Sequence, residues 1–463
     1  MSILERLSQA GERASDIAER YIPDAWVVCM LLTLVAFALA LGGAGADPVT
    51  AVTAWGNGMW GLLQITMQFA IAVFAAYACV MSRAGFRLFD WMAKIPNPEK
   101  PWQAILLMAV VTTLTGFLNW ALCFVVSALF IPFLARRNPN TDIRVISAGA
   151  LMGVGTVTNA GLSGSAALIM ATPDNPIINP AIGQPLVDRL YPVTETIFSG
   201  FNLAMLVVIS VVSIVAIVLL HPRGNARVVT FSAERLDAIL PKPPEVGERR
   251  PGFSGWIENQ PFWTWFAGLM ILFTLAYNIA TQGFGRAWNI NAYNAVFLGA
   301  ALLLHGNPLS FVHAVRRGLD AAYGVILQFP FYGGIFGLMT GTALGGWLSG
   351  LFAEFSSRAF FPFVVYAYSA VMNFFVPSAG SKWIIEAPYI LGAGQTLEVS
   401  NITTLLAYMY GDTLTNLIHP YMAIPIMAIT GLKFGEFAGY TFFVGVALFF
   451  VMSTAMFLIP LTL

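Results

Sequence analysis

Residues 153–165 read GVGTVTNAGLSGS, and this run of small and polar residues interrupts an apolar stretch over residues 143–172. A second apolar stretch, residues 403–420, is interrupted by the polar run GDTLTNLIHP at residues 411–420. Backbone without hydrogen bonds is too costly in lipid, so a break at membrane depth must line a protein-enclosed or watery cavity. Two such breaks, one in each half of a chain, are typical of the binding site of a secondary transporter.

The composition places the chain in a membrane. Hydrophobic residues make up 58% of the 463 residues and charged residues 10%, whereas about 25% of a soluble globular chain is charged. The net charge of zero gives no long-range field that would recruit nucleic acid. The sequence has no phosphate loop, no dinucleotide fingerprint and no Cys–His cluster. We therefore expect membrane lipid as a partner, no nucleic acid, no enzyme activity and no cofactor.

Apolar stretches of about 20 residues predict the helical spans. Residues 1–22 form an amphipathic surface helix, and residues 43–57 form a loop. The predicted spans are 25–42, 59–81, 143–172 (broken), 198–220, 262–281, 293–305, 323–352, 403–420 (broken) and 437–459. The fold class is thus an all-α integral membrane protein with about nine transmembrane helices.

Two further apolar runs, residues 103–134 and 361–391, are each interrupted midway. Their halves are too short to cross a bilayer alone, so each run is predicted to be a re-entrant hairpin. Lys and Arg gather on residues 82–100, on residues 136–144 and on the linker 221–260. Positively charged residues collect on the cytoplasmic side of a membrane protein. All three segments can lie on that side only if the first hairpin returns to the side from which it enters the membrane. The N-terminus is then cytoplasmic as well.

The chain is predicted to contain two repeats, residues 23–220 and 282–463. A cytoplasmic linker (221–260) and a connecting helix (261–281) separate them. Seven residues recur at a constant offset of 260: Val52, Ala54, Gly58, Gln68, Phe69, Gly85 and Leu88 match Val312, Ala314, Gly318, Gln328, Phe329, Gly345 and Leu348. Because one helix lies between the halves, the repeats are inverted, and this geometry permits alternating access.

Four titratable side chains lie deep in predicted membrane segments: Lys382, Glu386, Asp412 and His419. A charge at the bilayer centre costs about 2.5–3.5 kcal/mol on insertion scales, so each should pair or face water. Lys382 and Glu386 are four residues apart on one helix face and could pair; alternatively, Lys382 serves an anionic substrate or Asp412. Asp412 is the predicted coupling residue, which takes a proton or helps to hold Na⁺. His419 either relays protons or packs at a helix end.

Small polar residues at the breaks and hairpin turns complete the predicted site, because helix N-termini there would attract a carboxylate. The predicted substrate-binding residues are Asn119, Trp120, Ser163, Gly164, Ser165, Asn373, Ser378, Gly380, Ser381 and Lys382. The predicted ion-coupling residues are Asn159, Glu386, Asp412, Asn416 and His419. The coupling ion is H⁺ or Na⁺, and a Na⁺ site would lie near Asn119, Asn373 and Asp412.

Six motifs together resemble the bacterial short-chain fatty acid transporter family, which is grouped with the ion transporter superfamily. They are FLNW (117–120), LSGS (162–165), ATPDNP (171–176), LQFPFY (327–332), NFFVPSAG (373–380) and YGDT (410–413) with its continuation to Pro420. The resemblance covers nearly the whole chain. It implies uptake of small monocarboxylates such as butyrate or acetoacetate across the bacterial cytoplasmic (inner) membrane. It also implies a homodimer, with a scaffold domain and a transport domain that carries both hairpins and moves as an elevator.

The chain departs from the family pattern in and after the second hairpin. Ser381 and Lys382 precede Trp383 where the family has Gly followed by His or Gln, and Glu386 and His419 each replace Gln. One hypothesis is that the ammonium group of Lys382 substitutes for a bound cation. Two alternatives to monocarboxylate uptake stay open: proton-driven export of aminobenzoyl-glutamate or drug-like molecules, and a passive carboxylate channel.

Overall fold

The structure is a computed structural model that describes residues 25–222, 228–241 and 251–463. The predicted surface helix over residues 1–22 lies outside these ranges, as do parts of the predicted linker. Every regular element in the described ranges is helical, which confirms the all-α prediction. Seven of the described helices are long and apolar enough to cross a membrane.

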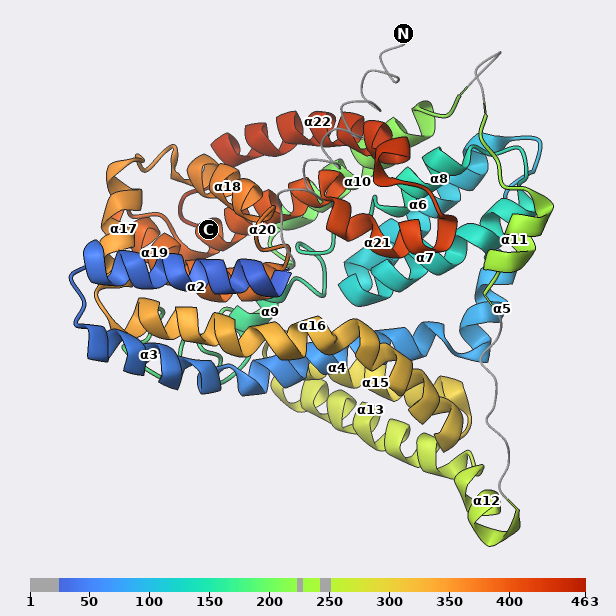
Figure 1. The fold of residues 1–463 in the computed structure, drawn as a ribbon, viewed down its shortest axis with the longest axis horizontal. Helices are drawn as coiled ribbons and strands as arrows, with labels where there is room; N and C mark the ends of the chain where they lie inside the picture. Colours follow the sequence, from blue (N-terminus) through green and yellow to red (C-terminus); the bar gives the residue numbers. More distant parts are fainter. Residues whose placement is uncertain (1–24, 223–227, 242–250) are drawn as a thin grey trace.

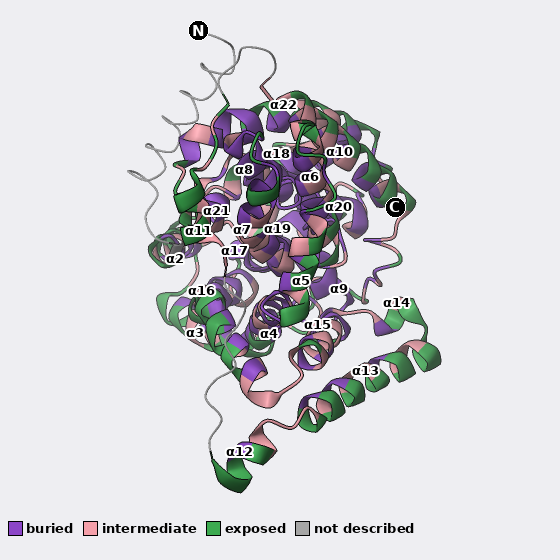
Figure 2. Cartoon of the chain, turned by 90° about the vertical axis from the view of Figure 1, so that its right-hand side faces the viewer, coloured by how far each residue is buried: buried purple, intermediate pink, exposed green. Residues whose placement is uncertain are grey.

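One layer of the molecule is built around the long helix α16 (Pro308–Gly341) and is called the α16 layer below (Figure 1). Its other members are α2 (Ala25–Gly42), α3 (Pro48–Gly61), α4 (Leu63–Val80), α13 (Phe262–Gln282) and α15 (Ile290–His305). Figure 2 shows α13 exposed along most of its length. Phe266, Leu269, Phe273 and Tyr277 make this exposed face apolar. Such a face requires a hydrocarbon or protein covering.

The second layer, called the hairpin layer below, contains two helical hairpins and two broken helices (Figure 1). The first hairpin is α6 (Pro101–Leu118) with α7 (Trp120–Arg137), and the second is α18 (Phe361–Met372) with α19 (Ala379–Thr396). The first broken helix is α8 (Ile143–Ala150) with α9 (Ser165–Ala171). The second is α20 (Asn401–Thr415), a 3₁₀ turn (Asn416–Ile418) and α21 (Pro420–Thr430). Helices α10 (Gly200–Leu219) and α22 (Phe434–Leu458) pack beside them, and the short connecting helices are α5 (Arg83–Met92), α11 (Ala233–Ile239), α12 (Gly252–Glu258), α14 (Phe284–Ala287) and α17 (Leu344–Glu354).

Both hairpins return to the end of the molecule that they leave. Beside the first hairpin, the Asn140 amide donates to the carbonyl of Pro98 at 3.4 Å, and Arg137 pairs with Asp90 at 3.0 Å. Beside the second hairpin, Arg358 pairs with Glu398 at 3.3 Å. These contacts join the residues just before each hairpin to those just after it; for the first hairpin, the charge pattern predicted this return.

Helices α3 and α4 run antiparallel to α16, and glycines bring the backbones together. A Cβ on Gly58 would lie 2.4 Å from the carbonyl oxygen of Gly333, and a Cβ on Gly318 would lie 2.9 Å from Phe74. Small residues at such crossings let helices in a membrane approach closely. Helix α16 begins at Pro308, 260 residues after Pro48, where α3 begins. This is the offset that the predicted repeats require; their inversion stays a prediction.

The structure corrects two predicted boundaries in this layer. Residues 43–57 were predicted to be a loop, but α3 begins at Pro48, where Asp47 accepts a hydrogen bond from the amide of Thr50 at 2.9 Å. An acidic cap followed by proline is a strong helix start. The span predicted over residues 323–352 is also wrong. Helix α16 begins earlier and carries Arg316, Arg317 and Asp320 at its polar end, and it stops at Thr342.

Two expectations for the hairpin layer are also wrong. Helices α6 and α7 have 18 residues each and are long and apolar enough to cross a membrane, so these halves are not too short. The second break was placed from Gly411 onward, yet α20 continues through Gly411 and Asp412. Gly411 serves packing instead, because a Cβ there would lie 2.1 Å from the carbonyl oxygen of Tyr366. The first break falls where it was predicted, between α8 and α9.

Candidate functional site

A cavity of about 210 Å³ lies where the two layers meet beside the breaks. The α16 layer contributes Phe69 from α4 and residues of α16 between Ala321 and Tyr332. The hairpin layer contributes both hairpins and both broken helices. Pockets for drug-sized ligands measure roughly 300–1,000 Å³, so this cavity suits a smaller molecule.

Seven of the predicted site residues line this cavity: Trp120, Asn159, Ser165, Ser378, Gly380, Asp412 and Asn416. The other eight lie behind its wall: Asn119, Ser163, Gly164, Asn373, Ser381, Lys382, Glu386 and His419. Most of these eight position the lining residues through buried hydrogen bonds.

The tip of the first hairpin is fastened to the first break. Asn119 is the only residue between α6 and α7, and its side chain caps α7 by accepting from the amide of Leu122 at 2.9 Å. The next amide, that of Trp120, donates to the hydroxyl of Ser163 at 2.9 Å. Gly164 allows the loop to close, because a Cβ there would lie 2.2 Å from the carbonyl oxygen of Asn159. These contacts orient Trp120 and Asn159 along the cavity.

The second hairpin is fastened to the second break in a similar way. The Asn373 amide donates to Thr415 Oγ1 at 3.0 Å and to Asn416 Oδ1 at 2.7 Å. The Asn416 amide in turn donates to the carbonyl of Val154, in the first break, at 3.2 Å. The two breaks therefore meet, although 262 residues separate Val154 from Asn416 in the sequence.

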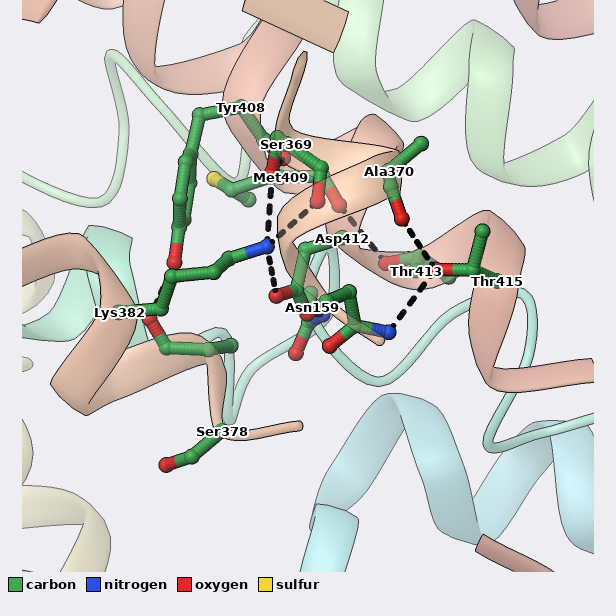
Figure 3. Close-up of polar contacts among 12 residues, drawn as sticks. Asn159, Ser369, Ala370, Ser378, Lys382, Tyr408, Met409, Asp412, Thr413 and Thr415 are labelled. Atoms are coloured by element: carbon green, nitrogen blue, oxygen red, sulfur yellow. Dashed lines mark hydrogen bonds and ion pairs between the residues drawn. The ribbon is translucent and has the colours of Figure 1, made fainter. Parts of the chain in front are cut away.

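Lys382 occupies an oxygen cage formed by three helices (Figure 3). Its ammonium group lies 2.6 Å from Asp412 Oδ1 on α20, 2.8 Å from the Ser369 carbonyl and 3.0 Å from Ser369 Oγ on α18. Tyr408 places its ring 4.9 Å from the same nitrogen. An ammonium has three donors and no acceptor, so the cage satisfies it. Asn159 donates to the other carboxylate oxygen, Asp412 Oδ2.

This cage decides between the alternatives predicted for Lys382. The ion pair forms with Asp412 and not with Glu386, although Glu386 lies only four residues away on α19. Both carboxylate oxygens of Glu386 lack a hydrogen-bond partner among the described residues. Of the alternatives left open for Lys382, the structure therefore shows the pairing with Asp412 and not the pairing with Glu386.

His419 packs at a helix end, which was one of its two predicted roles. Its Nδ1 accepts from the amide of Tyr421 at 3.1 Å and caps α21. Its Nε2 lies 3.2 Å from the carbonyl of Phe374 and donates to it. Both ring nitrogens are used in these two contacts, so the described geometry gives His419 a structural role.

The N-terminus of α19 faces the cavity with Ser378, Ala379 and Gly380. The first amides of a helix have no partner within it, and they carry partial positive charge. Ser381 holds the side chain of Ser378 in place at this end, because the Ser381 hydroxyl donates a hydrogen bond to the Ser378 hydroxyl at 2.6 Å. The arrangement can accept a small anion without a free cationic side chain.

The prediction missed the apolar wall of the cavity. Phe69 and Phe329 face each other with their ring centroids 5.4 Å apart, and Gln328, Tyr332 and other α16 residues extend this wall. The signal was present in the sequence, since Gln68–Phe69 and Gln328–Phe329 recur at the offset of 260. Only close contact between α4 and α16 shows that these two positions belong to a site.

A family model for short chain fatty acid transporters matches residues 3–463. The chain belongs to this family. Its relatives include a protein of Escherichia coli (strain K12) named "Putative short-chain fatty acid transporter", which is 32% identical over 450 residues, covering 96% of this chain and 97% of the relative. A protein of Haemophilus influenzae with the same name is 28% identical over 439 residues, covering 94% of this chain and 96% of the relative.

The fold of this family member is similar to that of a solved transporter. The crystal structure of the Alcanivorax borkumensis YdaH transporter aligns with a TM-score of 0.60 and covers 94% of this chain and 98% of the other. The two sequences are 16% identical, so the likeness concerns the fold alone.

Proposed function

We propose that this transporter takes up short-chain fatty acids or similar small monocarboxylates by secondary active symport with H⁺ or Na⁺. The observation that carries the proposal is the small cavity between the two layers, walled by both breaks and both hairpins. Breaks of this kind line the substrate sites of secondary transporters. The family of the chain supports the substrate class.

The chemistry of the cavity suits a monocarboxylate. The partial positive charge at the start of α19, beside Ser378 and Gly380, would hold the carboxylate. Phe69 and Phe329 would pack against a short alkyl chain. Lys382 neutralises Asp412, so the wall would not repel an anion.

The Lys382 cage supports a coupling scheme with little need for sodium. We propose that the ammonium group substitutes for a cation on Asp412, since it is held by a carboxylate, a carbonyl and a hydroxyl oxygen. Oxygens of these kinds are ligands of hard metal cations.

We further propose an alternating-access movement of the elevator type. The α16 layer would be the scaffold domain and the hairpin layer the transport domain, because the cavity lies between them. The two halves would be inverted repeats, and the protein would form a homodimer in the bacterial inner membrane with a cytoplasmic N-terminus. The exposed apolar face of α13 would then contact lipid or the second subunit.

Flux in proteoliposomes tests this function. We expect C2–C6 monocarboxylates to accumulate above their external concentration under an inward H⁺ or Na⁺ gradient. Equilibration without accumulation under either gradient would establish a channel, and extrusion against a concentration gradient under a proton gradient would establish an exporter.

A cavity-blocking variant links that flux to the proposed site. Gly380→Leu should abolish accumulation, because even a Cβ there would lie 2.9 Å from the Phe69 ring. Gly350→Leu is the matched control, since Gly350 also lies in a helix but faces open space. Equal flux in the two variants would show that the substrate passes elsewhere.

A further inference from the structure

Glu386, one of the predicted ion-coupling residues, is a buried carboxyl group that neither lines the cavity nor pairs with Lys382. Its side chain lies on α19 and is 1% exposed. Neither oxygen has a hydrogen-bond partner among the described residues. An ionised carboxylate without a partner is strongly disfavoured in such a place.

The groups around Glu386 contain one cation for two carboxylates. Lys382 and Asp412 interact with it electrostatically, and the tyrosines that interact with it are Tyr368 on α18, Tyr389 on α19 and Tyr408 on α20. The Tyr368 and Tyr389 hydroxyls bond to each other at 2.7 Å. If both carboxylates were ionised, the cluster would carry a net charge of −1, and the single ammonium is already bound by Asp412.

We propose that Glu386 is the binding site of a coupling proton and that Lys382 transmits its state to the cavity. This inference rests on the proposed monocarboxylate symport. A proton from solution binds the Glu386 carboxylate and makes it neutral. Lys382 then stays with Asp412, the cavity wall is neutral, and an anionic substrate binds.

Loss of the proton reverses this arrangement. An ionised Glu386 attracts the ammonium of Lys382, which reaches it because residues four apart share one face of a helix. Asp412 lines the cavity and is then no longer neutralised, so the site repels a carboxylate. One proton and one monocarboxylate therefore bind together, and the transport step is electroneutral.

Glu386→Gln tests the proposal, because glutamine imitates the neutral form of the carboxyl group. The native protein should accumulate butyrate under an inward proton gradient. The accumulation by the variant should be at least tenfold lower. The variant should still exchange internal for external butyrate, since loaded transport needs only the neutral form. Glu354→Gln, an exposed glutamate at the end of α17, is the control and should accumulate butyrate like the native protein.

Butyrate binding gives a second measurement that does not require transport. In detergent, the affinity of the native protein should fall at least tenfold as the pH rises past the titration of Glu386, whereas the affinity of Glu386→Gln should stay constant. Proton-driven accumulation by Glu386→Gln, or an unchanged pH dependence of its binding, would overturn the role of Glu386. Dependence of native accumulation on sodium alone would also overturn it, while leaving the symport intact. Failure of the native protein to accumulate any monocarboxylate would instead refute the proposed function.

Discussion

The ion pair between Lys382 and Asp412 predicts that a second substitution in this pair raises the free energy of unfolding, whereas a second substitution elsewhere in a core would lower it further. The two charges lie 2.6 Å apart, with side chains 1% and 2% exposed. Lys382→Met keeps the length of the side chain but leaves Asp412 with only the Asn159 amide. Removing one partner of a buried pair costs about 3–5 kcal/mol, whereas replacing both is often close to neutral. Adding Asp412→Asn to Lys382→Met should therefore restore at least about 2 kcal/mol.

A double-mutant cycle tests this prediction. It compares the free energy of unfolding, measured in detergent at pH 7, of the native protein, of Lys382→Met, of Asp412→Asn and of the double variant. The exposed pair Arg358–Glu398, 50% and 78% exposed at 3.3 Å, provides the control. Arg358→Met and Glu398→Gln should each cost less than about 1 kcal/mol and show little coupling. If Asp412→Asn destabilised the Lys382→Met background further, the buried ion pair would not exist as described, and the reasoning on the site would fail.

Two further predictions concern the same ion pair, and a third concerns the packing of α16 against α3. Asp412→Asn should fold, because Lys382 can turn to Glu386 one helical turn away, yet it should lose gradient-driven accumulation; full uptake in proteoliposomes would contradict this. Lys382→Gln should be more sodium-dependent than the native protein, since it frees Asp412 for a cation; identical sodium dependence would count against the substitution of a cation by Lys382. Gly337→Val should lower the unfolding temperature by separating α16 from α3, because a Cβ there already lies 2.3 Å from the Ala54 carbonyl, whereas Gly346→Val, in open space, should have a much smaller effect.

The sequence alone determined the class of the protein and the parts of its site that depend on local order. A chain that is 58% hydrophobic and 10% charged cannot be a soluble domain. The run between residues 153 and 165 is rich in Gly, Ser and Thr, which are poor helix formers, and the helix breaks in the structure where it was predicted to break. Asn119 marked the turn of the first hairpin because asparagine caps the helix that follows it.

Only the tertiary structure decided which charges meet and what closes the cavity. Spacing along α19 allowed Lys382 to pair with Glu386, but packing brought Asp412, 30 residues farther along the chain, to 2.6 Å from it. The glycine in the second polar run admits the backbone of α18 and does not end a helix. The Phe69–Phe329 wall formed for a similar reason, because α4 packs against α16, where Gly318 lets the backbone of Phe74 come close. Helical periodicity fixes the face on which a side chain lies; the neighbouring helix that covers this face depends on packing, which local sequence does not specify.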